Sequence, residues 1–189
     1  MGNKKEIKRC PWCCNDELYT HYHDTEWGKQ VTEDQVLFEF LILESAQAGL
    51  SWITILRKRE NYRRLFANFN PELVATYTQT NVEHILQDAG IIRNRLKVKS
   101  AISNSQIFLQ IQKEFGSFYN YLYSFMPKCK PIVNSFVSMQ NVPTKTEISD
   151  AISKDLKKRG FKFFGSVICY AYMQAVGMVN DHLLDCYFR

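Results

Sequence analysis

The sequence predicts an all-α fold, and three features lead to that class. Apolar residues recur at intervals of three and four along most of the chain, whereas the strict alternation typical of a half-buried strand is nowhere sustained. Serine, threonine or asparagine precedes several of these segments and glycine follows them, as at the two ends of a helix. With 189 residues, 46% of them hydrophobic, the chain can bury an ordinary core without disulfides. We expect one α-helical domain over residues 1–189.

The first long helix is predicted over residues 36–48. The preceding stretch Thr32-Glu33-Asp34-Gln35 has the pattern of a capping box, in which Thr32 accepts a hydrogen bond from the amide of Gln35. This helix is apolar on nearly all sides, which predicts a central position, and Gly49 is placed to end it. A second helix follows over about 52–68, and Asn70-Pro71 begins a short third one with proline at its first position.

The next two helices form a predicted hairpin over about residues 81–113. Asn81 begins the first helix, and Gly90 is placed to end it with a left-handed C-cap. The second helix starts only a few residues later, at about Asn94, and runs to Phe115. Two helices joined by so tight a glycine turn make a helix–hairpin–helix, whose loop presents backbone amides to an anion, as helix N-termini do.

The last third of the chain combines a connection with two helices. Three prolines lie between residues 126 and 147, where a surface loop is favoured over a short strand at 132–139. Ser149 then caps a helix to Arg159, and Ser166 caps a final helix that ends at Gly177.

Composition and charge exclude several classes of protein. No stretch approaches the roughly 20 apolar residues that span a bilayer, and the charged start, residues 1–6, lacks the apolar core of an export signal. We therefore expect a cytoplasmic protein with no membrane partner, whose six cysteines are metal ligands, reactive thiols or small hydrophobic residues. The net charge of +5 permits a phosphate partner. Basic clusters at 57–64, 93–99 and 157–162 favour nucleic acid, although a single cluster more often marks a solvated helix face.

Cysteine and histidine gather near both ends of the chain. The residues are Cys10, Cys13, Cys14, His21 and His23 at one end and His182 and Cys186 at the other. Because His182 and Cys186 are four apart, on a helical turn both point the same way, as two ligands of one metal must. A tetrahedral Cys2His2 zinc site drawn from both ends would close the chain like a clasp and would be structural. Spacing alone leaves equal room for scattered cysteines and partly buried histidines, because the two halves lie far apart.

The stretch from Cys10 to Cys13 also has the spacing of a redox dithiol. Such motifs depress the pKa of one thiol at the N-terminus of a helix that follows a strand. The chain lacks the alternating strand and helix pattern that provides this setting, so the redox interpretation is disfavoured.

One carboxylate is unusual in the apolar helix. Leu37 and Leu41 lie on the same helical face as Glu44, which therefore points inward and must be paired, protonated or waiting for a ligand. A buried ion pair with one of the arginines is one interpretation. The candidate aromatic neighbours are Trp12, Tyr19, Tyr22, Trp27 and Trp52. An acidic group among aromatic rings suits a flat cation, through stacking and charge together.

Several stretches carry a resemblance to a known family. They are Tyr22-His23-Asp24, Glu26-Trp27-Gly28, Leu43-Glu44, residues 47–54, 59–62, 88–93 and 157–163, and Asn180-Asp181-His182. With these blocks the chain resembles the type I 3-methyladenine DNA glycosylases of bacteria over about residues 10–186, whereas 127–147 match no block. The resemblance implies a helix–hairpin–helix glycosylase fold with a zinc clasp that joins segments of about 10–23 and 182–186.

Position by position, the resemblance implies roles for the candidate residues. One structural zinc ion would be bound by Cys10, His23, His182 and Cys186, with Cys13 and Cys14 as alternatives for the first ligand. Glu44 would be the catalytic residue, and the residues that hold the base or line its pocket would be Tyr22, Trp52, Tyr19, Trp12 and Trp27. Gly49 and Leu50 would fill the space left by the flipped base, and Gly90 and Arg93 would bind the DNA backbone.

The implied activity is hydrolytic release of 3-methyladenine from alkylated double-stranded DNA, by a monomer that flips the base out of the duplex. The alternative is a non-enzymatic, zinc-stabilised helix–hairpin–helix module that only binds DNA. Such a module would have no need for a lone glutamate among aromatic residues.

Overall fold

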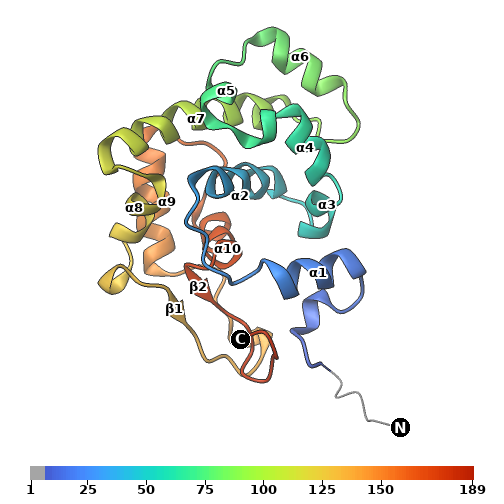
Figure 1. Cartoon of the computed structure of the whole chain (residues 1–189), viewed down its shortest axis with the longest axis vertical. Coiled ribbons are helices and arrows are strands. Elements are labelled where there is room, and N and C mark those ends of the chain that lie inside the picture. The colour runs from blue at the N-terminus through green and yellow to red at the C-terminus, as the bar shows by residue number, and fades with distance from the viewer. Residues whose placement is uncertain (1–6) are drawn as a thin grey trace.

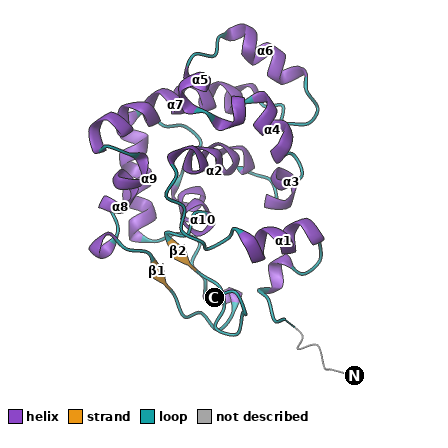
Figure 2. Cartoon of the chain, in the orientation of Figure 1, coloured by secondary structure: helices purple, strands orange, loops and turns teal. Residues whose placement is uncertain are grey.

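The computed structural model describes residues 7–189, and this part of the chain is mostly helical (Figures 1 and 2). The charged segment 1–6, on which the expectation about export rested, lies outside it. The α-helices are α1 (Glu17–Thr25), α2 (Asp34–Gln47), α3 (Trp52–Leu56), α4 (Arg59–Leu65), α5 (Pro71–Ala75), α6 (Gln79–Gln87), α7 (Arg95–Phe115), α8 (Phe118–Ser124), α9 (Glu147–Arg159) and α10 (Ser166–Ala175). Short 3₁₀ segments cover Pro11–Cys13, Ala67–Phe69, Pro127–Cys129 and Met139–Asn141. Among the described helices, none is both long and apolar enough to cross a membrane.

Helix α2 lies at the centre, as its apolar sequence predicts. All ten residues from Leu37 to Ala46 are buried, and the helix packs against α3, α7, α8 and α10 (Figure 1). The predicted capping box is wrong, because the Thr32 hydroxyl donates to the carboxylate of Glu33, and the side-chain amide of Gln35 donates to the Asn68 carbonyl. Gly49 follows the helix in the left-handed conformation (φ +82°), as expected of the residue that ends it.

The helix predicted over 52–68 is two helices, α3 and α4. The interruption falls at residues 57 and 58, and α4 places Arg59 in its first turn. That side chain is buried and donates to the carboxylates of Glu26 and Glu39, at 2.7 and 2.6 Å. These ion pairs join residues far apart in the sequence, so local periodicity does not predict the change of direction.

Helices α6 and α7 form the predicted pair of neighbouring helices and are joined by residues 88–94. Asn94 caps α7 as expected, its side chain accepting from the amides of Leu96 and Lys97. The left-handed C-cap predicted at Gly90 is wrong, because Gly90 is not among the glycines with positive φ. Close approach favours glycine there, since a Cβ atom would lie only 2.4 Å from Cγ of Asn61, whose side chain would have to move.

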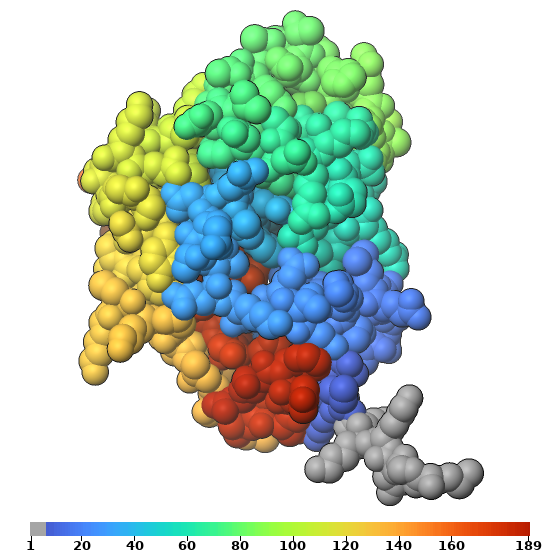
Figure 3. Space-filling view, viewed as in Figure 1, coloured from blue at the N-terminus to red at the C-terminus, as the bar shows by residue number. Residues whose placement is uncertain are grey.

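The C-terminal part contains the departures from a strictly all-α fold. Ile132–Val133 (β1) pairs in parallel with Val179–Asn180 (β2), so the fold is mostly helical with one short pairing (Figure 2). Helix α8 is an element that the sequence analysis did not separate. Helix α9 begins two residues before the predicted cap, because Thr146 and not Ser149 is its N-cap. The segment after β2 lies against the beginning of the described chain, which brings the two ends together (Figure 3).

Candidate functional site

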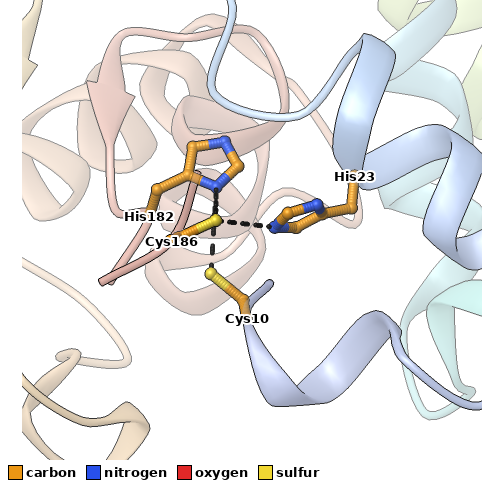
Figure 4. A group of neighbouring side chains, drawn as sticks. All are labelled: Cys10, His23, His182 and Cys186. Atoms are coloured by element: carbon orange, nitrogen blue, oxygen red, sulfur yellow. Dashed lines mark hydrogen bonds between the residues drawn. The ribbon is translucent and has the colours of Figure 1, made fainter. Parts of the chain in front are cut away.

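Four side chains of the types that bind metals, from the two ends of the chain, meet in one cluster. Their ligand atoms, from Cys10, His23, His182 and Cys186, all lie within 4.8 Å of one another, and all four side chains are buried (Figure 4). Sγ of Cys186 lies 3.5 Å from Nε2 of His23 and 3.4 Å from Nδ1 of His182, which is 3.8 Å from Sγ of Cys10. Cys186 is brought there by turns after β2 and not by the helical turn that its spacing suggested.

The geometry of the cluster suits a tetrahedral metal ion. Bond lengths of about 2.3 Å to sulfur and about 2.0–2.1 Å to nitrogen separate the ligands of tetrahedral zinc by about 3.3–3.8 Å. The second nitrogen of each imidazole already has a partner. Nδ1 of His23 lies 2.8 Å from the carboxylate of Asp24, and Nε2 of His182 lies 3.1 Å from the carbonyl oxygen of Trp27. Such outer contacts orient metal-binding histidines. Burial also lowers the pKa of His182 to about 4, which keeps its ring neutral.

The other cysteines near the N-terminus point elsewhere. Sγ of Cys13 and Sγ of Cys14 lie 3.1 and 3.4 Å from the carbonyl oxygen of Cys10, to which both thiols donate, and neither belongs to the cluster. Burial raises the pKa of Cys13 to about 12, the opposite of the depressed value on which a redox dithiol depends. Cys10 is therefore the cysteine of this segment that is placed to bind a metal.

A pocket of about 200 Å³ lies beside the cluster. It is lined by Glu44 and the five aromatic residues singled out in the sequence, Trp12, Tyr19, Tyr22, Trp27 and Trp52, together with Gln47, Met139, Ala171 and Gln174. The rings form a continuous wall. The ring centroid of Trp12 is 4.8 Å from that of Tyr19 and 5.0 Å from that of Trp27. The pocket therefore joins an acidic group from α2 to aromatic rings from the N-terminal segment, α1 and α3.

Glu44 is the one acidic side chain among those lining residues. It is 3% exposed, and it makes no ion pair or hydrogen bond with the described residues. The buried ion pair left open by the sequence is therefore absent from this part of the chain, since Arg59 pairs with Glu26 and Glu39 instead. Burial raises the pKa of Glu44 to about 8. One carboxylate oxygen and Nε1 of Trp52 are buried without a partner, so the pocket holds polar atoms that a ligand can satisfy.

The turn after α2 carries an exposed leucine next to this pocket. Leu50 is 40% exposed, and its amide donates to the carbonyl of Gln47 at 2.6 Å. The ammonium group of Lys97, from α7, donates to the carbonyls of Ala46 and Ala48 at 2.8 and 2.7 Å. This lysine satisfies two of the free carbonyls at the end of α2 and so links the turn to α7.

The loop between α6 and α7 offers fewer free amides than its sequence suggested. The amide of Gly90 donates to the carboxylate of Asp88, and the amide of Ile92 donates to the hydroxyl of Tyr62. Arg93 is exposed. The amides of Ile91 and Arg93 have no acceptor among the described residues, but Ile91 is buried, so the amide and side chain of the exposed Arg93 are what remains for an anion.

Four lining residues of the pocket were missed in the sequence. Gln47 follows Glu44 by three residues on the same helix, so the helical period would have indicated it. Ala171 and Gln174 have the same relation on α10, but no chemical signal in the sequence directs attention to that helix. Met139 lies in the segment 127–147, to which the sequence analysis assigned no role.

Comparisons with known proteins agree with this arrangement. The model of the methyladenine glycosylase family matches residues 12–189. DNA-3-methyladenine glycosylase 1 of Escherichia coli strain K12 is 48% identical over 180 residues, which cover 95% of this chain and 96% of that protein. A crystal structure of 3-methyladenine DNA glycosylase I superposes with a TM-score of 0.92 at 47% identity, over 95% of this chain and 98% of the other.

A third relative was solved in a study of 3-methyladenine recognition. It is the 3-methyladenine DNA glycosylase I of Staphylococcus aureus, with a TM-score of 0.92 and 35% identity over 96% of both chains. The helical fold and the acidic, aromatic pocket define an enzyme of the DNA glycosylase class, a hydrolase of N-glycosyl bonds. The chain belongs to the methyladenine glycosylase family.

Proposed function

We propose that this protein is a base excision repair enzyme that releases 3-methyladenine from alkylated DNA. One observation carries the proposal: an unpaired, buried glutamate faces an aromatic pocket in a chain 48% identical to a DNA-3-methyladenine glycosylase. The reaction is hydrolysis of the N-glycosidic bond after the damaged base has left the stack, because the bond cannot be reached inside a duplex. Methylation at N3 makes adenine a cation and hence a good leaving group. Selection and positioning therefore matter more than a strong general acid.

Glu44 is the residue that we assign to selection. Its carboxylate accepts from the exocyclic amine of the base and favours the positive charge, a charged hydrogen bond worth roughly 1.5–3 kcal/mol. Since burial raises its pKa to about 8, the carboxyl group is mostly protonated in the empty pocket at neutral pH. A bound cation favours the ionised form, so binding of the base is accompanied by release of a proton. Tyr22 and Trp52 stack on the ring, which adds roughly 1–3 kcal/mol, and Tyr19, Trp12 and Trp27 complete the wall.

The partner is double-stranded DNA, bound along the side of the molecule that carries the hairpin. We assign α6, α7 and their loop as a helix–hairpin–helix, with Gly90 letting the loop lie close to Asn61 and Arg93 contacting phosphate. Such contacts fix the protein on the duplex without reading sequence. Gly49 and Leu50 fill the gap left by the flipped base, and Lys97 holds this turn through the end of α2. The protein acts as a cytoplasmic monomer with a single domain.

The Cys10, His23, His182 and Cys186 cluster binds one zinc ion with a structural role. Four protein ligands leave no open position for substrate or water, so the metal fastens the two ends of the chain and takes no part in the reaction. The clasp holds Trp12, Tyr22 and Trp27 in place, because these residues neighbour the ligands in sequence and in space.

Chromatography of bases released from methylated DNA tests this function. We expect free 3-methyladenine to appear in proportion to time and enzyme. A protein that only bound DNA, the alternative left by the sequence, would retain methylated duplex in a binding assay and release no base. Binding without release would contradict the proposal.

A further inference from the structure

The part of the pocket wall formed by α10 carries a polar side chain with no assigned role. Gln174, on α10, lines the same pocket as Glu44, and α10 packs against α2. The side-chain nitrogen of Gln174 lies 2.8 Å from a carboxylate oxygen of Asp181, just after β2. Asp181 belongs to the Asn180-Asp181-His182 block, in which only the histidine has so far been given a function.

Asp181 is a fully buried carboxylate surrounded by donors. Its side chain is 0% exposed and accepts from the hydroxyl of Tyr170 at 2.7 Å, from the amide of Asn134 at 2.7 Å and from Gln174. A carboxylate offers only acceptors, so the end of Gln174 that faces it must be the NH₂ group. The hydrogen-bond network therefore fixes which way this amide is turned.

The side-chain oxygen of Gln174 is consequently left without a partner in the described part of the chain. This oxygen accepts no hydrogen bond from the described residues. The buried side-chain atoms of these residues that lack a partner do not include it, so it is accessible to solvent or to a ligand. The residue itself is half-buried in the pocket wall. The arrangement is a hydrogen-bond acceptor of fixed orientation, held at the pocket by a buried anion.

We propose that Gln174, oriented by Asp181, is a specificity-determining residue that accepts the second N–H of the exocyclic amine of 3-methyladenine. This inference rests on the proposed function. In 3-methyladenine attached to deoxyribose the exocyclic amine is the only strong donor on the ring, and it has two hydrogens. One is bound by Glu44 and the other by Gln174. Guanine carries a carbonyl at this position, so 7-methylguanine, although also a cation, would face an acceptor with no proton between them.

The fixed acceptor of Gln174 distinguishes an amine from a carbonyl, which Glu44 alone does not. Burial raises the pKa of Glu44 to about 8, so its carboxyl group is mostly protonated before a base binds. The carbonyl of guanine, unlike the amine of 3-methyladenine, can accept a hydrogen bond from that proton and so keep the group protonated. The amide oxygen of Gln174 cannot donate in any protonation state within the physiological range. Rejection of 7-methylguanine therefore depends on Gln174 and on the carboxylate that keeps it turned.

Two substitutions test the assignment on DNA that carries both methylated bases. Gln174→Leu removes the acceptor at similar size, and we expect release of 3-methyladenine to fall about tenfold, the loss of one hydrogen bond to a charged group. Asp181→Asn can donate as well as accept, so the amide of Gln174 is free to turn its NH₂ group toward the pocket. We expect the ratio of 7-methylguanine to 3-methyladenine released to rise about tenfold.

The matched control is Asn134→Ala, which removes a donor from the other oxygen of Asp181 and leaves the bond to Gln174 intact. The ratio of 7-methylguanine to 3-methyladenine released by this variant should equal that of the parent. Melting curves and metal content check that Asp181→Asn, next to His182, remains folded and metal-loaded. If both variants, at positions 174 and 181, are folded and keep the parent's ratio of 7-methylguanine to 3-methyladenine, this inference is overturned while the proposed function still stands. A parent protein that releases no 3-methyladenine would overturn the proposed function and this inference with it.

Discussion

Replacing Glu44 with glutamine keeps the size of the side chain and removes its ability to ionise. Burial raises the pKa of Glu44 from 4.5 to about 8. Below pH 4.5 the carboxyl group of Glu44 is protonated in both the folded and the unfolded protein, so its burial involves no desolvation of a charge. As the pH rises, the unfolded chain ionises first, and the folded state loses stability until the pH passes the folded pKa. The free energy of unfolding of the parent should therefore fall between about pH 4.5 and pH 8.

The size of this effect follows from the shift. Each pKa unit corresponds to about 1.4 kcal/mol, so the parent loses about 3 kcal/mol of stability between pH 4.5 and pH 7. Glu44→Gln has no ionisable group at this position and therefore does not suffer this loss of stability. Urea denaturation of the two proteins at pH 5 and pH 7 measures the difference. We expect the variant to be more stable than the parent by about 3 kcal/mol at pH 7 and by less than about 1 kcal/mol at pH 5.

A control separates this effect from a general dependence on pH. Glu72→Gln changes an exposed glutamate on α5, and its effect on stability should be the same at both pH values. If Glu44→Gln shifts stability equally at pH 5 and pH 7, or is the less stable protein at pH 7, then Glu44 is not a buried, unpaired carboxyl group. A gain in stability together with a loss of activity would identify Glu44 as a residue kept for function at the expense of the fold.

Further predictions concern the metal, the Gly49-Leu50 turn and the proposed helix–hairpin–helix. Protein purified without chelators should contain one zinc per chain, and Cys10→Ser should lose it while Cys14→Ser retains it. The reverse result in elemental analysis would identify Cys14, and not Cys10, as the ligand. Removal of zinc should lower the melting temperature. Leu50→Ala should slow excision from duplex DNA more than from single strands, because only in the duplex does the flipped base leave a gap in the stack. Equal losses on both substrates would show that Leu50 does not fill this gap. Arg93→Ala should reduce the salt dependence of DNA affinity by about one phosphate contact, a change of about 0.9 in the slope of log K against log salt; an unchanged slope would place Arg93 away from the backbone.

The sequence predicts those parts of the fold that depend on local patterns. The apolar run of α2, the cap at Asn94 and the glycine at 49 each reflect chemistry within a few residues, and the structure agrees with them. The break between α3 and α4 depends on Arg59 reaching Glu26 and Glu39. The pairing of β1 with β2 joins segments far apart in the chain. Neither depends on local periodicity, so neither could be predicted from it.

The same distinction holds for the candidate site. Glu44 is recognisable because a charged residue on an apolar helical face requires an explanation wherever it occurs. Its aromatic neighbours and the four clustered ligands could be proposed from residue types, although only the folded chain brings them together. Gln174 gives no such signal, since a glutamine on a helix is ordinary. Its interest comes entirely from Asp181, which the fold places against it.

Release of bases from one methylated duplex, followed side by side for the parent and for Glu44→Gln, tests the role of Glu44 most directly. Both proteins should be folded and equally loaded with zinc. The parent should release 3-methyladenine much faster than 7-methylguanine, and the variant should release 3-methyladenine at least about tenfold more slowly than the parent, as loss of a charged hydrogen bond requires. Equal release of 3-methyladenine by the two proteins would contradict the assignment of Glu44 as a residue that selects the base, and equally fast release of both bases by the parent would contradict this account of the pocket.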